Sequence, residues 1–338
     1  MNLIVLLDYK GRFESKYTAT PYRSGMDLEL LKSRFKDLGI KVKFQYFSDL
    51  DFKKLEDSTY LYSSYEDKNG LYKSYIEDVV YGLTINQKKL IPEYKYLKAH
   101  NNKVFMEILR DSLFKIEEND LESKHFGTLQ DFLNFKKPIE YPVVSKPAAG
   151  SKSKGVSLSK NLNELLNNLK KISRNFELKN YLHDKIRTRR HQKYISNSFH
   201  KHKFIIQKYI PNVQGDWKIL IYGKRFYTLF RESRDNDFRA SGSGKLIFKE
   251  DINERILDFA EEIKSKLNTP IVSLDIAFIE GVCYLLEFQV LYFGTYTIEY
   301  SSLFYEKINK LWVIKREKSE LEKVYADAIY DFLLESNK

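Results

Sequence analysis

The sequence predicts an N-terminal α/β lobe with a parallel sheet, followed by a longer region of the α+β class. Two observations predict this. Strand-like apolar runs alternate with helix-like runs through the first hundred residues, which is typical of parallel sheets with right-handed crossovers. Beyond residue 200, two pairs of strand-like runs are each separated by a short glycine-containing turn, which is typical of antiparallel hairpins.

The N-terminal elements follow from the spacing of the apolar residues. Residues 3–8 (LIVLLD) are almost continuously apolar and are expected to form a buried strand. Residues 25–39 are amphipathic, with Asp27 near the start of a helix and Gly39 at its end. Two further strands and a second helix are expected at 40–47, 58–65 and 75–83. No glycine-rich fingerprint follows the first strand, so a standard dinucleotide-binding domain is excluded.

The later elements are assigned in the same way. Residues 91–114 begin near Pro92 and are predicted to form one amphipathic helix. Residues 174–203 are rich in basic residues, and no element is assigned to them. Hairpins are expected at 216–233, turning at Gly223-Lys224, and at 272–290, turning at Glu280-Gly281. Further strands are expected at 142–147 and 204–210, a strand and a helix at 156–172, and helices at 252–267 and 320–336.

The composition limits the class of protein. The chain has 338 residues, of which 43% are hydrophobic and 30% charged, as in ordinary globular proteins. No apolar stretch approaches the roughly 20 residues that span a bilayer, and the first apolar run is too short for a signal peptide. The single cysteine, Cys283, cannot form an internal disulfide, so we expect a cytoplasmic protein. The net charge of +11 either favours anionic partners or reflects lysines spread over a solvated surface.

A loop of small residues follows a lysine at residues 146–158 (KPAAGSKSKGVSL). A P-loop would require Gly-Lys-Ser/Thr leading into a helix, whereas here Gly155 is followed by Val156 and a strand-like run. The P-loop is therefore excluded. Two interpretations stay open, namely a hairpin loop that folds over a triphosphate and an ordinary flexible turn between strands.

Oxygen-bearing side chains occur together in the last predicted hairpin. Glu287 and Gln289 are two residues apart on a strand and therefore share a face. Asp275 joins that face if the turn has an odd number of residues, as in a three-residue bulged hairpin. Carboxylate and amide oxygens are ligands that a hard divalent cation prefers. Glu287 could be an edge carboxylate, but its strand is mostly apolar, and a buried carboxylate is costly without a cation or several donors.

Two more segments carry groups suited to a nucleotide. Residues 207–210 stand where a strand leaves its sheet, and main-chain groups in such a position can contact an adenine edge, with Asp216 near a ribose. Arg231 and Arg239 stand near a second loop rich in small residues. Arg231 could equally be an ion-paired residue of the sheet.

The order of these segments resembles the ATP-grasp superfamily, in particular the type that includes glutathione synthetase and the ribosomal-protein glutamate ligases. The resemblance covers roughly residues 95–335 and implies two α+β lobes that sandwich ATP. It implies an N-terminal α/β domain at 1–95 and an ATP-grasp domain at 96–338. Within that domain it implies a lid lobe at about 140–210 and a C-terminal lobe at about 211–338.

The resemblance also implies roles for individual residues. Lys103 and Lys146 would bind the phosphates of ATP. Asp275, Glu287 and Gln289 would hold one or two Mg²⁺ ions, for which Mn²⁺ could substitute. The catalytic cations would be Arg231, Arg239 and Lys218. The other nucleotide-binding residues would be Gly150, Ser151, Ser153 and Gly155 in the lid, Gln207, Lys208, Tyr209 and Ile210 in the hinge, and Asp216.

The sequence departs from the family pattern at several of these positions. Gln207 stands where the family usually has Glu, Lys218 stands in place of an arginine, and Gln289 replaces the usual Asn. Residues 290–298 (VLYFGTYTI) also differ from the usual asparagine–x–x–proline–glycine ending. The resemblance therefore implies an unusual metal site and an unusual substrate edge.

The activity implied is that of an ATP-dependent carboxylate–amine ligase, which forms an amide or peptide-like bond through an acyl phosphate and releases ADP and phosphate. The alternative is an ATP-grasp kinase with a stable phosphorylated product. The expected substrates are small-molecule or sugar-linked carboxylates and amines, with neither nucleic acid nor membrane as partner, and a homodimer is left open. The basic cluster 185–194 is assigned to clamping an anionic substrate or to a solvated helix face, with nucleic-acid or acidic-surface binding as a rival.

Overall fold

The computed structural model describes residues 1–65, 69–114, 121–150, 153–234, 239 and 244–336. The chain forms two compact units. The first unit contains residues 1–100, 113–115 and 213–338, and the second contains residues 101–112 and 116–212. The first unit contains two sheets and the second contains one, and each unit has its own hydrophobic core.

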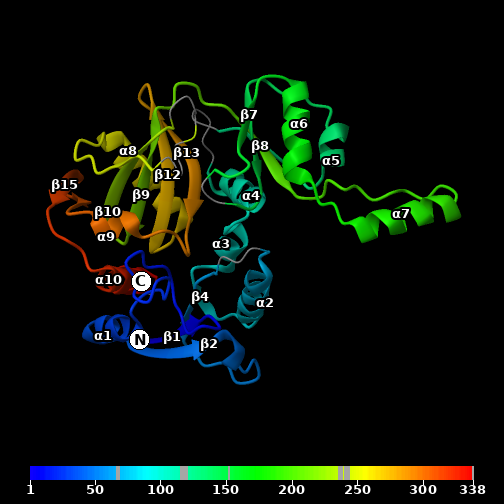
Figure 1. The fold of residues 1–338 in the computed structure, drawn as a ribbon. Coiled ribbons are helices and arrows are strands. Elements are labelled where there is room, and N and C mark those ends of the chain that lie inside the picture. The colour runs from blue at the N-terminus through cyan, green and yellow to red at the C-terminus, as the bar shows by residue number, and fades with distance from the viewer. Residues whose placement is uncertain (66–68, 115–120, 151–152, 235–238, 240–243, 337–338) are drawn as a thin grey trace. The chain divides into compact units, whose positions relative to one another are not determined.

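The N-terminal part of the first unit is a four-stranded parallel sheet in the order β2-β1-β3-β4 (Figure 1). Its strands are β1 (Asn2–Leu7), β2 (Lys41–Tyr46), β3 (Thr59–Leu61) and β4 (Lys89–Ile91). The accompanying helices are α1 (Leu28–Asp37), the short η1 (Phe47–Asp49), α2 (Leu71–Ile85) and α3 (Tyr94–Ala99). Asp27 caps α1 by accepting a hydrogen bond from Leu30 N at 3.0 Å, and Gly39 follows the helix with a φ of +72°. The predicted parallel sheet is thus confirmed.

The remainder of the first unit is built on an antiparallel sheet of seven strands. Their order is β13-β12-β9-β10-β14-β15, with β11 paired to β10. The strands are β9 (Gly215–Tyr222), β10 (Arg225–Glu232), β11 (Leu246–Ile247), β12 (Ile271–Ile279), β13 (Val282–Gln289), β14 (Phe304–Ile308) and β15 (Leu311–Lys315). The helices are α8 (Glu254–Leu267), α9 (Tyr296–Tyr300) and α10 (Leu321–Glu335). Both predicted hairpins are present at their predicted turns, whereas the hairpin β14–β15 lies outside the predicted elements.

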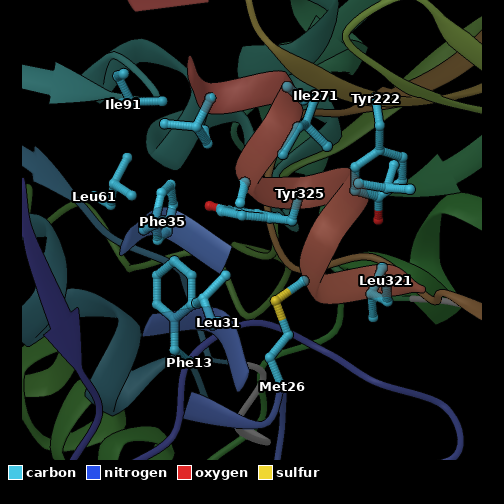
Figure 2. Packing of buried hydrophobic residues seen from close by; sticks show 14 of the residues in the cluster. Phe13, Met26, Leu31, Phe35, Leu61, Ile91, Tyr222, Ile271, Leu321 and Tyr325 are labelled. Carbon is cyan, nitrogen blue, oxygen red and sulfur yellow. The ribbon is translucent and has the colours of Figure 1, made fainter. Parts of the chain in front are cut away.

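One hydrophobic core joins the two sheets of the first unit. Figure 2 shows Tyr325 of α10 among side chains from both ends of the chain, including Phe35 of α1 and Ile271 of β12. Tyr222 of β9 belongs to the same cluster. Burial of this shared apolar surface fixes α10 between the parallel sheet and the large sheet.

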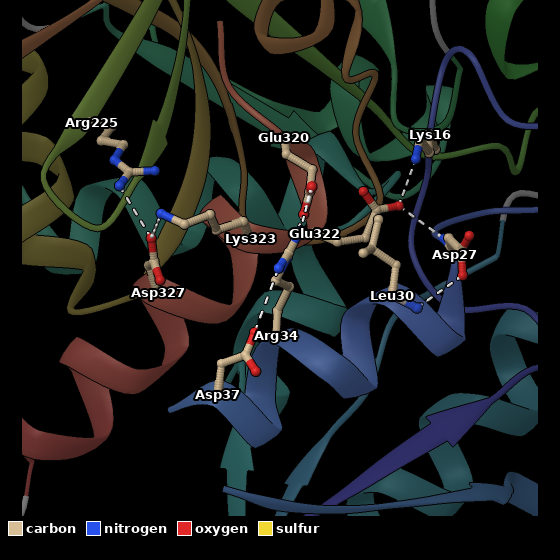
Figure 3. A network of polar contacts seen from close by, with 10 residues as sticks. All are labelled: Lys16, Asp27, Leu30, Arg34, Asp37, Arg225, Glu320, Glu322, Lys323 and Asp327. Carbon is tan, nitrogen blue, oxygen red and sulfur yellow. Dashed lines mark hydrogen bonds and ion pairs between the residues drawn. The ribbon is translucent and has the colours of Figure 1, made fainter. Parts of the chain in front are cut away.

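Polar contacts reinforce the same junction (Figure 3). Glu322 on α10 is fully buried, and its Oε1 accepts hydrogen bonds from Lys16 Nζ at 2.7 Å and Asp27 N at 2.9 Å. Arg34 of α1 donates from Nε and Nη2 to the two carboxylate oxygens of Glu320, at 2.7 and 2.8 Å. The start of α10 is therefore tied to α1 and to the loop that precedes it.

The second unit contains a four-stranded antiparallel sheet in the order β5-β8-β6-β7. Its strands are β5 (Ser123–Phe126), β6 (Val143–Pro147), β7 (Ser157–Ser159) and β8 (Phe204–Lys208). Its helices are α4 (Lys103–Leu113), α5 (Leu129–Asn134), α6 (Leu162–Ser173) and α7 (Leu178–Arg190). Apolar residues of α5 and α6, among them Phe132, Leu165 and Leu169, pack on Val143, Phe204 and Ile206 of the sheet.

Two predicted segments differ in the structure. Residues 91–114 form two helices, α3 and α4, because the chain turns at Asn101, which has a left-handed φ of +49°. Residues 174–203, to which no element was assigned, contain α7. Within the part of the chain that is described, no helix is long and apolar enough to cross a membrane.

Candidate active site

Charged side chains gather at one end of the large sheet in the first unit. Asp216 and Lys218 are two residues apart on β9, so they share a face of the sheet. Arg231 of β10 is directly opposite Asp216, and Asp275 of β12 is directly opposite Lys218, so these side chains extend from that same face. Further along β9 the same face carries Leu220, which belongs to the core shared with α10. One face of the sheet is thus apolar at one end and charged at the other.

A bulge in β13 brings the predicted metal ligands onto this face. The turn of the hairpin has the two predicted residues, Glu280 and Gly281, both with positive φ, so an odd-numbered turn is not what brings Asp275 onto the face. The extra residue lies instead within β13, where the register shifts after the pair Asp275–Glu287 and leaves Leu286 without an opposite residue. The bulge places Asp275 opposite Glu287, as the prediction required.

Gln289 completes this part of the site. It lies opposite Ser273 on β12, and its Nε2 donates to Glu287 Oε1 at 3.3 Å. The side-chain carbonyl oxygen of Gln289 is therefore not the atom that contacts Glu287. Asp275, Glu287 and Gln289 lie on one face, which fits the oxygen donors that Mg²⁺ prefers. Among the described residues, no three His, Cys, Asp or Glu side chains form a metal-binding group, so a metal held here would also need the amide oxygen of Gln289.

Arg231 is held by two carboxylates. Its Nε and Nη2 donate to Asp216 Oδ1 and Oδ2 at 2.6 and 2.9 Å, and Nη2 lies 2.7 Å from Asp275 Oδ2. Burial raises the pKa of Asp216 to about 6, although the charge of Arg231 opposes the shift. Burial would also raise the pKa of Asp275, but the charges of Arg231 and Lys218 outweigh it and lower the pKa below its ordinary value. Asp275 is thus ionised while it faces these cations.

Lys218 lies beside the same carboxylate. Its Nζ is 3.7 Å from Asp275 Oδ1 and donates to Ser273 Oγ at 2.9 Å. Asp275 Oδ1 itself is buried and accepts no hydrogen bond from the described residues. This oxygen is therefore available to a stronger electrophile, such as a metal ion.

Gly215 lets β10 approach β9 closely enough to form the Arg231–Asp216 contact. A Cβ atom at this position would lie 2.4 Å from Arg231 O and 2.6 Å from Phe230 Cζ. No side chain larger than hydrogen fits there without moving the backbone of Arg231.

The second unit contains a separate polar group around Lys146. Its Nζ donates to Gln207 Oε1 at 2.6 Å, and Gln207 Nε2 donates to Glu107 Oε1 at 3.4 Å. Lys103, at the start of α4, donates from Nζ to Gly150 O at 2.9 Å. Asn101 Oδ1 accepts from Gly150 N at 2.9 Å, so the start of the loop is fixed from both sides. The structure thus brings together Lys146 with Gln207, and Lys103 with Gly150.

Sequence reasoning missed Glu107. It is almost fully buried on α4, it accepts a hydrogen bond from Ser123 Oγ at 2.6 Å, and it forms an ion pair with Arg110. Burial raises its pKa, against the opposing charge of Arg110. A signal was present, since Lys103, Glu107 and Arg110 recur at helical spacing on one side of α4.

The other residues that were predicted to bind nucleotide or to act in catalysis lie mostly in loops. Gly155 has a φ of +76° and lies against Pro147, and Ser153 has a φ of +56°. Lys208 ends β8, where its N donates to Glu122 O at 2.9 Å, and Tyr209 and Ile210 follow it half-buried. Arg239 is half-buried, and its carbonyl oxygen accepts from Arg234 N at 3.1 Å. Ser151 lies outside the described residues.

A polar pocket lies where β1 and β3 end, and sequence reasoning did not identify it. It is lined by Asp8, Arg12 and Glu14 after β1, by Ser63 and Ser64 after β3, and by Tyr292 among others. In the strand order β2-β1-β3-β4, the chain goes from β1 to a neighbour on one side, β2, and then to the neighbour on the other side, β3. Ligands bind at such a point, beyond the carboxyl ends of the strands, in open α/β sheets.

Two acidic and two basic side chains line this pocket, namely Asp8 and Glu14 with Arg12 and Arg23. Tyr292 N donates to Glu14 Oε2 at 3.1 Å, and burial raises the pKa of Glu14 to about 7. Arg12 is compensated by Asp8, since Arg12 Nη2 lies 2.6 Å from Asp8 Oδ2. Tyr292 is only three residues beyond Gln289, so the pocket adjoins the charged end of the large sheet along the chain.

Comparisons with known proteins bear on the fold. No family model matches the chain, and no curated protein is similar to it in sequence. Among solved structures, D-cycloserine synthetase DcsG matches with a TM-score of 0.54 and 13% identity, over 98% of this chain and 100% of that one. The ADP complex of N5-carboxyaminoimidazole ribonucleotide synthetase matches with a TM-score of 0.53 and 10% identity, over 89% of this chain and 73% of that one. Glycinamide-RNase-transformylase T from Mycobacterium tuberculosis matches with a TM-score of 0.52 and 9% identity, over 97% of this chain and 80% of that one.

Proposed function

Because the chain has the ATP-grasp fold, we propose that it is an ATP-dependent ligase that joins a carboxylate to an amine through an acyl phosphate. Two proteins of similar fold are named as synthetases, and one of them was solved with ADP. The observation that carries the proposal is the charged end of the large sheet, where Asp275, Glu287 and Gln289 share a face with Arg231 and Lys218. Phosphoryl transfer needs this combination of oxygen ligands and cations.

In the first unit the proposed work is charge neutralisation. Asp275, Glu287 and the amide oxygen of Gln289 would hold Mg²⁺, which when bound offsets charge on phosphate oxygens. Lys218 and Arg231 would stabilise the oxygens of the transferred phosphoryl group. Asp216 holds the Arg231 guanidinium in one orientation through its two hydrogen bonds, so little reorganisation is needed when charge develops.

In the second unit the proposed work is nucleotide binding. Lys146 and Lys103 would each offset phosphate charge, and Gln207 already orients the Lys146 ammonium through its side-chain oxygen. Main-chain groups of residues 208–210, just after β8, would contact the adenine. The glycine- and serine-rich loop 149–155 would cover the phosphates. These assignments follow from the resemblance and from the two described contacts, Lys146–Gln207 and Lys103–Gly150.

Only the amino group of the amine substrate is assigned to the pocket at the ends of β1 and β3, because the volume of this pocket, about 10 Å³, suits a group about the size of one water molecule. A substrate ammonium there would meet the carboxylate of Glu14. Of the two arginines that line the pocket, Arg12 is already compensated by Asp8, and Arg23 lies over the ring of Tyr22. An amine must lose a proton before it attacks an acyl phosphate, and a carboxylate whose pKa is about 7 can accept that proton near neutral pH.

The proposal is tested by screening pairs of carboxylates and amines for release of ADP and inorganic phosphate. With a productive pair, the two products should appear in equal amounts. With the carboxylate alone, hydroxylamine should trap the acyl phosphate as a hydroxamate. The Glu287→Gln variant serves as a control for contaminating ATPases. ADP formed together with a product that keeps the phosphate would favour the kinase instead.

A further inference from the structure

Helix α7 of the second unit carries a row of apolar side chains that nothing in the described structure covers. Leu178, Leu182 and Ile186 recur every fourth residue and therefore lie along one side of the helix. Their exposed fractions are 62%, 52% and 46%. Figure 1 shows α7 standing apart from the sheet and from α6 of its own unit. A soluble helix normally turns such a row toward a core.

The opposite side of α7 is already occupied. Tyr181 packs against the ring of Phe199 with centroids 5.7 Å apart. Asp184 is buried, and its Oδ1 accepts hydrogen bonds from Tyr194 Oη at 2.8 Å and Asn197 N at 3.3 Å. The returning segment 194–199 therefore holds the helix in place through this side. The exposed apolar row is not needed for that packing.

Cations flank the apolar row. Six exposed cationic side chains belong to the helix or follow it directly, namely Lys179, Lys185, Arg187, Arg189, Arg190 and Lys193. Within the described parts of the chain, none of them forms an ion pair with a carboxylate within 4.0 Å. Asp184 is the only acidic residue between 178 and 195, and it faces the other way. The surface thus combines exposed apolar area with positive charge, of which only the charge of Arg187 is partly offset by Asp184.

We propose that this face of α7, defined by Leu178, Leu182 and Ile186 with its flanking cations, binds the surface of a membrane rich in anionic phospholipid. An amphipathic helix of this composition lies in the interface, with apolar side chains among the acyl chains and cations at the headgroups. A membrane-surface role for α7 departs from the sequence-based expectation that no membrane is involved. It does not depend on the proposed ligase activity.

Other occupants fit the face less well. Nucleic acid would neutralise the cations but would leave the apolar row in water. A second copy of the chain would cover the row, but two such faces would bring like charges together in a protein whose net charge is already +11. An anionic lipid surface satisfies the apolar and the charged groups together.

The test is sedimentation of the full-length protein with vesicles. Binding is expected with vesicles that contain about 30% phosphatidylglycerol, and little binding with phosphatidylcholine alone, because each Lys or Arg near an anionic surface strengthens binding by about fivefold. Replacing Arg189 and Arg190 by Gln should therefore weaken binding by about 25-fold. Lys170→Gln with Lys171→Gln is the matched control, because these exposed cations lie on α6, away from the apolar row, and this variant should bind nearly as wild type does.

The apolar row is tested by a variant with Leu178→Gln, Leu182→Gln and Ile186→Gln, since Gln is a good helix former and keeps the charges. This variant should bind at least about tenfold more weakly. Circular dichroism checks that the helix persists, and the charge variant tests the same face without altering the apolar row. Equal binding to neutral and anionic vesicles would overturn the proposal. So would equal binding by the variant with Arg189→Gln and Arg190→Gln and by the control with Lys170→Gln and Lys171→Gln. The proposal would also be overturned if sedimentation velocity showed a dimer that the variant with Leu178→Gln, Leu182→Gln and Ile186→Gln no longer forms, because a second copy would then be the occupant.

Discussion

At the scale of single residues, charge balance explains the arrangement at the end of the large sheet. The cations Arg231 and Lys218 are matched by the carboxylates Asp216 and Asp275, and Glu287 adds a further negative charge on the same face. Clusters of buried charges are tolerated when each charge has a partner of opposite sign. The carboxylates Asp216 and Asp275 thereby allow the two cations to lie side by side at this end of the sheet.

Glu287→Gln should lower turnover by on the order of a hundredfold, because it removes one preorganised electrostatic group from the proposed reaction centre. The thermal transition should change little, since the side chain is only partly buried. Turnover is measured as ADP release at saturating ATP across a series of Mg²⁺ concentrations. Gln289→Asn is the control and should retain most activity, because the amide oxygen is kept. Normal turnover by Glu287→Gln would contradict the assignment of a metal ligand.

Glu14 should make the protein less stable as the pH rises toward 7. Its pKa is raised by burial from the ordinary 4.5 to about 7, so between these values the folded state binds a proton that the unfolded state has lost. Stability then falls by up to about 1.4 kcal/mol per pH unit as the pH rises through that window, and the effect is complete above it. Asp216 and Glu107, whose pKa values are also raised by burial, act with the same sign, so Glu14 accounts for one part of this fall in stability.

The measurement is urea unfolding at several pH values. Glu14→Gln mimics the protonated carboxyl and should reduce the slope of stability against pH between pH 6 and 7. An unchanged slope in this variant would show that Glu14 does not titrate in that interval.

Sequence reasoning located some site residues better than others, for physical reasons. The trio Asp275, Glu287 and Gln289 belongs to one hairpin, where alternation along the strands decides which side chains share a face. The sequence around Glu14 and around Glu107 does not indicate burial, since a carboxylate in a loop or on an amphipathic helix is normally expected to be exposed to solvent. Their burial depends on contacts with Tyr292 and Gln207, which lie far away in the sequence.

At the scale of elements, turn chemistry separates the hairpins that were predicted from the one that was not. The hairpins β9–β10 and β12–β13 each contain glycine in the turn, which signals two-residue turns with positive φ. The hairpin β14–β15 turns at Asn309-Lys310, both with positive φ but without glycine, so its signal is weak. The single predicted helix at 91–114 failed for a related reason, because periodicity alone does not reveal a left-handed residue such as Asn101.

Gly215→Ala should destabilise the first unit by about 1–3 kcal/mol, because the new methyl group would overlap Arg231 O and force β9 and β10 apart. The same displacement moves Arg231, so turnover should also fall. Differential scanning fluorimetry and the ADP-release assay measure the two effects. Gly294→Ala is the matched control, since a Cβ there would contact nothing within 4 Å, and it should change stability by less than about 0.5 kcal/mol. Equal effects of the two substitutions would contradict the proposed role of the close strand approach.

At the scale of the whole molecule, α10 joins sequence regions from both ends of the chain into one unit. Its residues Val324, Tyr325 and Ile329 share a core with β1 and α1, which lie some 300 positions earlier. The sequence predicted α10 as a helix, but periodicity shows only that a helix has an apolar side and not which element covers it. The first hundred residues therefore belong to the same compact unit as residues 213–338 because of long-range packing.

Glu322→Ala should destabilise this unit as a whole. The substitution leaves Lys16 and Asp27 N without their shared carboxylate oxygen, and removing one partner of a buried ion pair costs about 3–5 kcal/mol. Hydrogen exchange should therefore accelerate together in the parallel sheet β1–β4 and in the strands β9–β13, while β5–β8 of the second unit keep their protection.

Glu320→Ala, at the residue directly before the same helix, is the control. Its pair with Arg34 is much more exposed, with 38% of the glutamate side chain accessible, so the loss should stay within about 1 kcal/mol. If Glu322→Ala loosened α10 alone and left β1–β4 protected, the N-terminal sheet would be stable without α10. The shared core would then not hold the two sheets in a single cooperative unit, because local unfolding of a helix that joins them must expose both of the surfaces it covers.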